Sequence, residues 1–128
     1  MMRFAVPVRL FAFAIAAMLV ACAHLDQPRS YLVYFDTDSA TLTPDGQRIV
    51  ATIASTAGDV SPSKILVSGR ADGATAHDAA LADQRATAVM QALAQHGVAA
   101  AKIEKQPDAP PSGLTGVAAH EVVVTLLP

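Results

Sequence analysis

Hydrophobic and polar positions after residue 30 fall into blocks that predict four strands. The segments YLVYFD, KILVSG and HEVVVTLL are short and rich in β-branched or aromatic residues, which is typical of strands. The segment KILVSG is almost continuously apolar, as expected of a central strand. A weaker segment of the same kind, AKIEKQ, precedes a proline-containing stretch that predicts a loop.

Two further blocks show apolar residues at helical spacing. The first is expected over residues 43–57, because Thr43 can cap a helix, Pro44 suits its first position, and Gly58 is a natural stop. The second is expected over residues 78–96, before Gly97. Its apolar stripe consists of Leu81, Ala88, Val89, Ala92 and Leu93.

The resulting order is βαβαββ. Strands and helices in this order favour an α/β (α+β) fold, a mixed four-stranded sheet with both helices packed on one face. The 98 residues of 31–128 suffice for one domain with a modest core and no disulfide. No internal repeat or second apolar stretch of membrane length is visible.

Residues 1–21 have the features of an export signal. Arg3 and Arg9 precede the uncharged segment LFAFAIAAMLVA, which is too short for a typical membrane span. The segment ends in LVAC, which resembles the bacterial lipobox, where cleavage precedes a cysteine that is then acylated. Cys22 is the only cysteine, so it cannot form an internal disulfide. The alternative is a conventional signal peptide with an incidental cysteine.

Removing this signal changes the charge balance. The remaining residues, 22–128, keep all 11 acidic residues but only 7 basic ones, a formal charge of −4. This balance argues against nucleic acid or anionic lipid headgroups as partners of the domain as a whole. Residues 22–30 are expected to be a lipidated cysteine followed by a polar tether that spans roughly 25 Å when extended.

Two parts of the chain resemble the OmpA-like peptidoglycan-binding domain, in the setting of a peptidoglycan-associated lipoprotein. VYFDTDSATLTPDG is similar to the opening strand and turn of that family. The later signature is a strand ending Gly-x-x-Asp and a helix beginning Asn-x-x-Leu-Ser-x-x-Arg-Ala. Gly69, Asp72, Leu81 and Arg85 match its marker residues.

The resemblance implies binding of diaminopimelate, a zwitterionic side chain of the peptidoglycan stem peptide. Asp72 would bind its ammonium group and Arg85 its carboxylate, through the planar fork of the guanidinium. The stem of Arg85 is expected to pack along the apolar stripe with the guanidinium at the exposed rim. Spacing alone favours the alternative that Asp72 and Arg85 pair with each other. Asp38 and Asp78 are further candidates, although Asp38 could instead support the turn backbone.

Several positions depart from the family pattern. Asp78 replaces the asparagine and Ala82 the serine, while Arg70 and Ala71 replace a histidine and a threonine. Arg70 is therefore expected as a local counter-ion for Asp72. The loop between Asp72 and Arg85 is about two residues shorter than usual, and AAHE stands where the family has Asn-Arg-Arg, so a second cation is missing.

Three functions follow as hypotheses. The first is a lipid-anchored protein of the outer membrane, facing the periplasm, that binds peptidoglycan noncovalently. The outer membrane is favoured because residue 23 is alanine and not aspartate. The second is a degenerate OmpA-like domain that binds other envelope proteins only. The third, a small periplasmic enzyme, is disfavoured because no Gly-x-Ser-x-Gly motif occurs. No cofactor or metal is expected, and a cluster of His77, Asp78 and Asp72 lacks regular ligand spacing.

Overall fold

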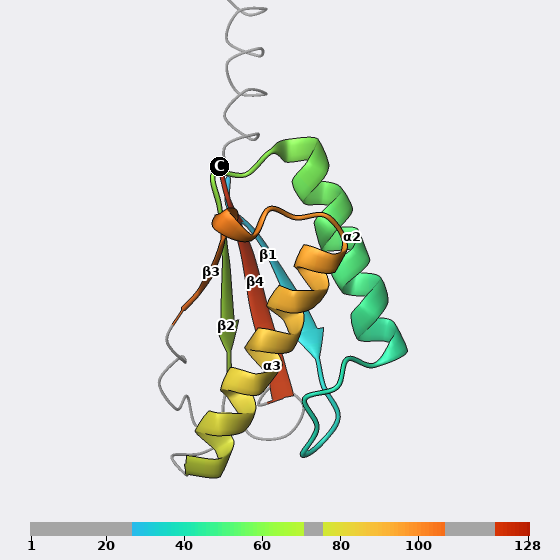
Figure 1. The fold of residues 1–128 in the computed structure, drawn as a ribbon, viewed down its shortest axis with the longest axis vertical. Helices are drawn as coiled ribbons and strands as arrows, with labels where there is room; N and C mark the ends of the chain where they lie inside the picture. The colour runs from blue at the N-terminus through green and yellow to red at the C-terminus, as the bar shows by residue number, and fades with distance from the viewer. Residues whose placement is uncertain (1–26, 71–75, 107–119) are drawn as a thin grey trace, which may run out of the picture.

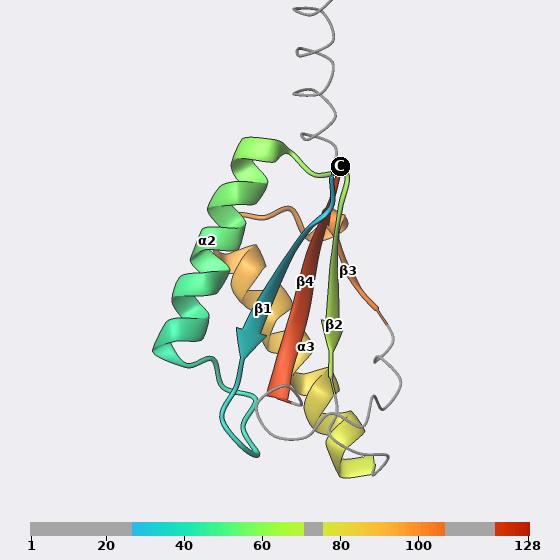
Figure 2. The same ribbon diagram turned by 180° about the vertical axis from the view of Figure 1, so that it is seen from behind.

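A four-stranded sheet with two helices on one face forms the domain (Figures 1 and 2). The computed structural model describes residues 27–70, 76–106 and 120–128. The strand order is β1-β4-β2-β3, with β2 and β3 parallel and the other neighbours antiparallel. The predicted fold class is confirmed. Its elements are β1 (Arg29–Tyr34), α2 (Pro44–Val60), β2 (Lys64–Gly69), α3 (Ala76–Gln95), β3 (Ile103–Lys105) and β4 (Glu121–Leu127).

The helix ends differ from the predicted ones. Helix α2 begins as expected, with the Thr43 side chain accepting a hydrogen bond from the Gly46 N–H, but it continues past Gly58. It ends where Ser61 adopts a left-handed conformation and donates its N–H to Ala57. Pro62 explains this stop, because a residue before proline disfavours the helical region. Helix α3 begins two residues before the predicted start and ends one residue before the predicted end.

The strand ends also differ. Strand β1 begins at Arg29, so the predicted tether overlaps its first two residues. Strand β3 has only three residues, because a short 3₁₀ helix, η2 (Ala100–Lys102), occupies the start of the AKIEKQ segment. Both differences are of the size expected when strand ends are predicted from a sequence pattern, because the last residues of an element contribute little to its periodicity.

The core lies between the sheet and the helices. Val122, Val124 and Leu126 alternate along β4 toward the helices, and the intervening residues face the opposite side of the sheet. Leu32 and Tyr34 on β1 are exposed on that opposite side. The largest fully buried side chains are those of Ile53, Ile65, Leu93, Val33, Val50, Val67, Val89, Val122 and Val124.

The antiparallel pairing gives the sheet two distinct ends (Figure 1). At one end, called here the loop end, β1 and β2 finish, β4 starts and the turn to α2 begins. At the other, called the entry end, β1 starts, β4 finishes and α2 terminates. Within the described ranges, no helix is both long and apolar enough to cross a membrane.

Candidate functional site at the loop end

A tight turn follows β1 at the loop end. Ser39 donates its N–H to the Asp36 carbonyl at 3.2 Å, and the Ser39 hydroxyl accepts the Thr41 N–H at 3.1 Å. Asp38 lies at φ 55°, in the left-handed region that aspartate tolerates better than most residues. The carbonyls of Asp36 and Ser39 both accept hydrogen bonds from Arg85 of helix α3.

Arg85 is the central side chain of this region. Its Nε donates to the Ser39 carbonyl at 2.7 Å and its Nη2 to the Asp36 carbonyl at 3.0 Å. The guanidinium carbon lies 5.7 Å from the centre of the Phe35 ring, within cation–π range. Only 2% of the residue is exposed. The predicted exposure of the guanidinium at the rim is therefore wrong, because the turn after β1 folds over it.

Two opposing influences act on the pKa of Arg85. Burial, the larger, lowers the pKa below its ordinary value, and the negative charge of Asp38 raises it. A guanidinium remains charged at neutral pH even so. The loop end thus contains a buried positive charge whose hydrogen bonds, among the described residues, go to neutral carbonyls.

Gly69 brings helix α3 close to the end of β2. A Cβ atom at Gly69 would overlap the backbone of Ala82, whose carbonyl carbon would lie 2.9 Å away. Ala82 itself is fully buried. The marker glycine in the sequence therefore has a steric reason: any larger residue would push away the helix that carries Arg85.

The second charged group at this end belongs to an ion pair between neighbouring strands. Arg70 follows β2 directly and contacts the Glu121 carboxylate at 2.8 Å, while its N–H donates to the Glu121 carbonyl. Glu121 is 4% exposed. Arg70 was expected as the counter-ion of Asp72. In the described structure its carboxylate partner is Glu121. Glu121 is the last residue of AAHE, the segment that stands where the family has Asn-Arg-Arg.

The structure describes two of the other three predicted site residues, Asp38 and Asp78. Asp38 is near enough to influence Arg85, but its own carboxylate is exposed and 3.7 Å from His77. Asp78 lies half-buried in the first turn of α3. Asp72 falls outside the described residues, as do residues 73–75 of the short segment between Asp72 and Arg85. Within residues 27–70, 76–106 and 120–128, no three potential ligand side chains converge on a metal position.

A hollow of about 620 Å³ lies beside the turn, on the α2 side. Sequence reasoning missed it because its walls come from three separate segments that only the fold brings together. One signal was available: polar residues are concentrated in DTDSATLTPDG. The lining residues are Tyr34, Phe35, Asp36, Thr37, Thr43, Pro44, Asp45, Gly46, Ile49 and His120.

Comparison with known proteins agrees with this architecture. The sequence profile of the OmpA family matches residues 34–109. Among solved structures, the chain is similar to the OmpA-like domain of FopA1 from Francisella tularensis, with a TM-score of 0.67 and 23% identity over 77% of this chain and 71% of that one. A search of curated protein sequences gives no significant match.

Two other solved structures are similar. The peptidoglycan-associated lipoprotein from Burkholderia pseudomallei is 28% identical, with a TM-score of 0.59 over 75% of this chain and 87% of that one. The periplasmic domain of Helicobacter pylori MotB is 18% identical, with a TM-score of 0.63 over 80% and 77% of the two chains. The family match covers more than half of the chain, which therefore belongs to the OmpA family.

Proposed function

We propose that this protein is a lipid-anchored component of the cell envelope that binds peptidoglycan noncovalently through diaminopimelate. The observation that carries the proposal is Arg85, a buried cation whose contacts within the described part of the chain are neutral carbonyls and an aromatic ring. Burying a charge among neutral groups costs on the order of several kcal/mol, and an apolar residue would avoid that cost. A ligand carboxylate would supply a negative charge in direct contact with the guanidinium.

The geometry at Arg85 suits that role. The two carbonyls use Nε and Nη2 and fix the plane of the guanidinium, so the remaining N–H groups are preoriented. A carboxylate binds such a fork with charge-assisted hydrogen bonds. Because the residue is only 2% exposed, ligand entry has to displace part of its cover. The turn at Asp36 to Ser39 forms part of that cover.

The ligand ammonium would be bound by carboxylates. We propose Asp72 for this role, from its place in the family motif, with Asp38 and Asp78 adding negative charge around it. Asp38 already interacts electrostatically with Arg85. Its carboxylate is exposed and so is free to reorient toward a ligand. The proposed binding site needs no catalytic residue, because holding a zwitterion requires only two opposite charges at a fixed spacing.

The test is a pulldown of residues 24–128 with purified diaminopimelate-type peptidoglycan, using the lysine type as the comparison polymer. We expect Arg85→Lys and Asp72→Asn each to weaken binding about tenfold to hundredfold, the loss typical of a charge-assisted contact. Arg48→Ala is the matched control, because Arg48 is an exposed α2 residue whose ion-pair partner among the described residues is the exposed Asp45. Free diaminopimelate should compete with the polymer.

The alternative is an OmpA family domain that binds other envelope proteins and not peptidoglycan. The nearly complete burial of Arg85 favours this alternative, because holding the turn in place would by itself explain a side chain that is so well covered. Absence of wild-type binding in the pulldown, with a folded domain, would support this alternative. Binding that survives Arg85→Lys unchanged would instead show that the ligand site lies elsewhere.

The lipid anchor is a separate part of the proposal. We propose that Cys22 is acylated and becomes the first residue of the mature protein in the outer membrane, with the domain in the periplasm. Mass spectrometry of the protein from its native membrane tests this directly. An N-terminal peptide that begins at a residue other than 22, or an unmodified Cys22 thiol, would contradict it.

A further inference from the structure

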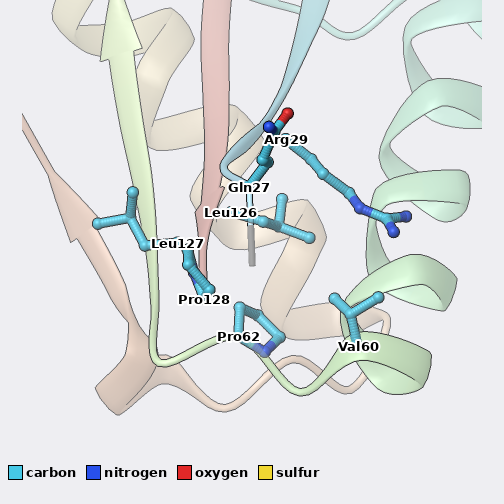
Figure 3. Close-up of a pocket in the computed structure, with 7 residues that line it drawn as sticks. All are labelled: Gln27, Arg29, Val60, Pro62, Leu126, Leu127 and Pro128. Carbon is cyan, nitrogen blue, oxygen red and sulfur yellow. The ribbon is translucent and has the colours of Figure 1, made fainter. Parts of the chain in front are cut away.

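The entry end of the domain carries a second pocket, distant from the candidate site. It is a cavity of about 140 Å³ formed where β1 begins, β4 ends and α2 terminates (Figure 3). We call it the entry pocket. Its lining residues are Gln27, Arg29, Val60, Pro62, Leu126, Leu127 and Pro128. Five of these seven are apolar, one is cationic and none is acidic.

We propose that the entry pocket docks on the phospholipid surface of the membrane in which the protein is anchored. The inference rests on the proposed acylation of Cys22 and does not depend on peptidoglycan binding. It commits to the headgroup and upper acyl region of the bilayer as the occupant. The length of chain before β1, the chemistry of the pocket and the charge of the opposite end each support it.

The chain length before β1 limits how far this end can be from the membrane. Six residues separate Cys22 from Arg29, the first residue of β1, and fully extended they span only about 20 Å. A tether this short keeps a surface at an effective concentration of about a millimolar or more. Even a weak affinity of the entry pocket for lipid would therefore be enough for docking.

The pocket chemistry matches a phospholipid surface. Val60 is exposed, and Leu127 is half-buried beside exposed Pro128, so apolar groups are available for shallow insertion. Arg29 is exposed, and the ion pairs among the described residues do not involve it. Figure 3 shows its side chain extending toward α2, across the pocket from Leu127. Its aliphatic stem can lie on the apolar residues while the guanidinium binds a lipid phosphate.

The two ends of the sheet carry different charges. Asp36 and Asp38 are exposed at the loop end, where an anionic membrane would be repelled, and Asp45 there is paired with exposed Arg48. The entry pocket has one cation among apolar residues, although exposed Asp59 lies next to Val60 outside its lining. Docking at the entry end would direct the loop end away from the membrane. Seven residues of β4 separate the two ends by about 20 Å.

Site-specific fluorescence quenching tests the docking. The full-length acylated protein is reconstituted into phosphatidylethanolamine and phosphatidylglycerol vesicles that contain a headgroup spin-labelled lipid. Acylation blocks Cys22, so a cysteine introduced by Val60→Cys or Thr41→Cys is the only free thiol for a fluorophore. We expect quenching at position 60 to exceed that at position 41 by roughly threefold or more, because interfacial insertion buries apolar groups to a depth of about 5–10 Å at the boundary between headgroups and acyl chains.

Further variants show whether the pocket itself causes the effect. Arg29→Glu combined with the label at position 60 should reduce quenching to the level at position 41, whereas Arg29→Lys should keep most of it. Pro128→Cys provides a second labelling position if the change at Val60 disturbs folding. Equal quenching at positions 60 and 41, or no effect of Arg29→Glu, would overturn the docking proposal.

Vesicle flotation distinguishes failure of the docking proposal from failure of the lipid anchor. Protein that floats with the vesicles but shows equal quenching retains the proposed anchor and rejects only the docking. Protein that does not float, with Cys22 unmodified by mass, rejects both. Peptidoglycan is absent throughout, so loss of peptidoglycan binding in the separate pulldown would leave this result unaffected.

Discussion

Two buried charges at the loop end differ in how they are compensated. Glu121 is 4% exposed and pairs at 2.8 Å with Arg70, the residue after the neighbouring strand β2. Arg85 is 2% exposed, and the described residues that bind it offer only neutral carbonyls and the Phe35 ring. Glu121 thus has its counter-ion within the fold. Among the described residues, the groups in contact with Arg85 are neutral and only the exposed Asp38 acts on it electrostatically, so Arg85 is a better candidate for binding an anion than the ion pair.

The largest change in the free energy of unfolding is expected from a substitution at Gly69. This residue precedes Arg70 and packs on the helix that carries Arg85. Gly69→Val should lower the free energy of unfolding by about 3 kcal/mol, because the side chain would overlap the Ala82 backbone. Urea unfolding followed by circular dichroism measures it. Gly58→Ala is the control, since nothing lies within 4 Å there, and it should stabilise by about 0.5–1 kcal/mol. Equal effects at both positions would contradict the close approach.

Removing the buried cation Arg85 should have the next largest effect. Arg85→Leu leaves the Asp36 and Ser39 carbonyls without their donors and should cost about 2–3 kcal/mol. Arg85→Lys should cost less, because one ammonium can still reach a carbonyl. Thermal and urea unfolding report both values. If Arg85→Leu is as stable as the wild type, desolvation of the guanidinium outweighs its hydrogen bonds, and a ligand role becomes the better reason for its presence.

The compensated charge should respond asymmetrically to mutation. Arg70→Leu leaves the buried Glu121 carboxylate unpaired and should cost about 2 kcal/mol, whereas Glu121→Leu leaves a guanidinium that water can partly solvate and should cost about 1 kcal/mol. The double replacement is expected to be close to the wild type in stability. A double-mutant cycle by urea unfolding tests this. Additive losses would mean that the two side chains do not act as a pair.

The smallest effect is expected at the exposed rim of the turn. Asp38→Asn removes the contact with His77 but keeps a residue that tolerates a positive φ, so unfolding free energy should change by less than about 0.5 kcal/mol. Asp38→Val should cost more, about 1–2 kcal/mol, because a branched side chain is strained there. Comparable stability of the two variants would show that the turn relaxes.

Local sequence signals predicted much of the fold. Thr43 and Pro44 start α2 where expected, because capping depends on neighbouring residues only. The β-branched run HEVVVTLL correctly predicted the last strand, which is β4. The errors occur where a distant contact or a backbone detail decides: α2 passes Gly58 until Ser61 and Pro62 end it, and η2 shortens β3.

The candidate site depended more on tertiary structure. The sequence by itself determined that Arg85 lies on the second helix near the apolar stripe, and that Gly69 precedes a turn. Only the fold decided that a turn 46 residues earlier would cover Arg85 with its carbonyls. Only strand pairing decided that Arg70 would meet Glu121. Periodicity specifies which face of an element is apolar, whereas the partner of a charged group depends on which distant segments pack beside it, and no local pattern carries that information.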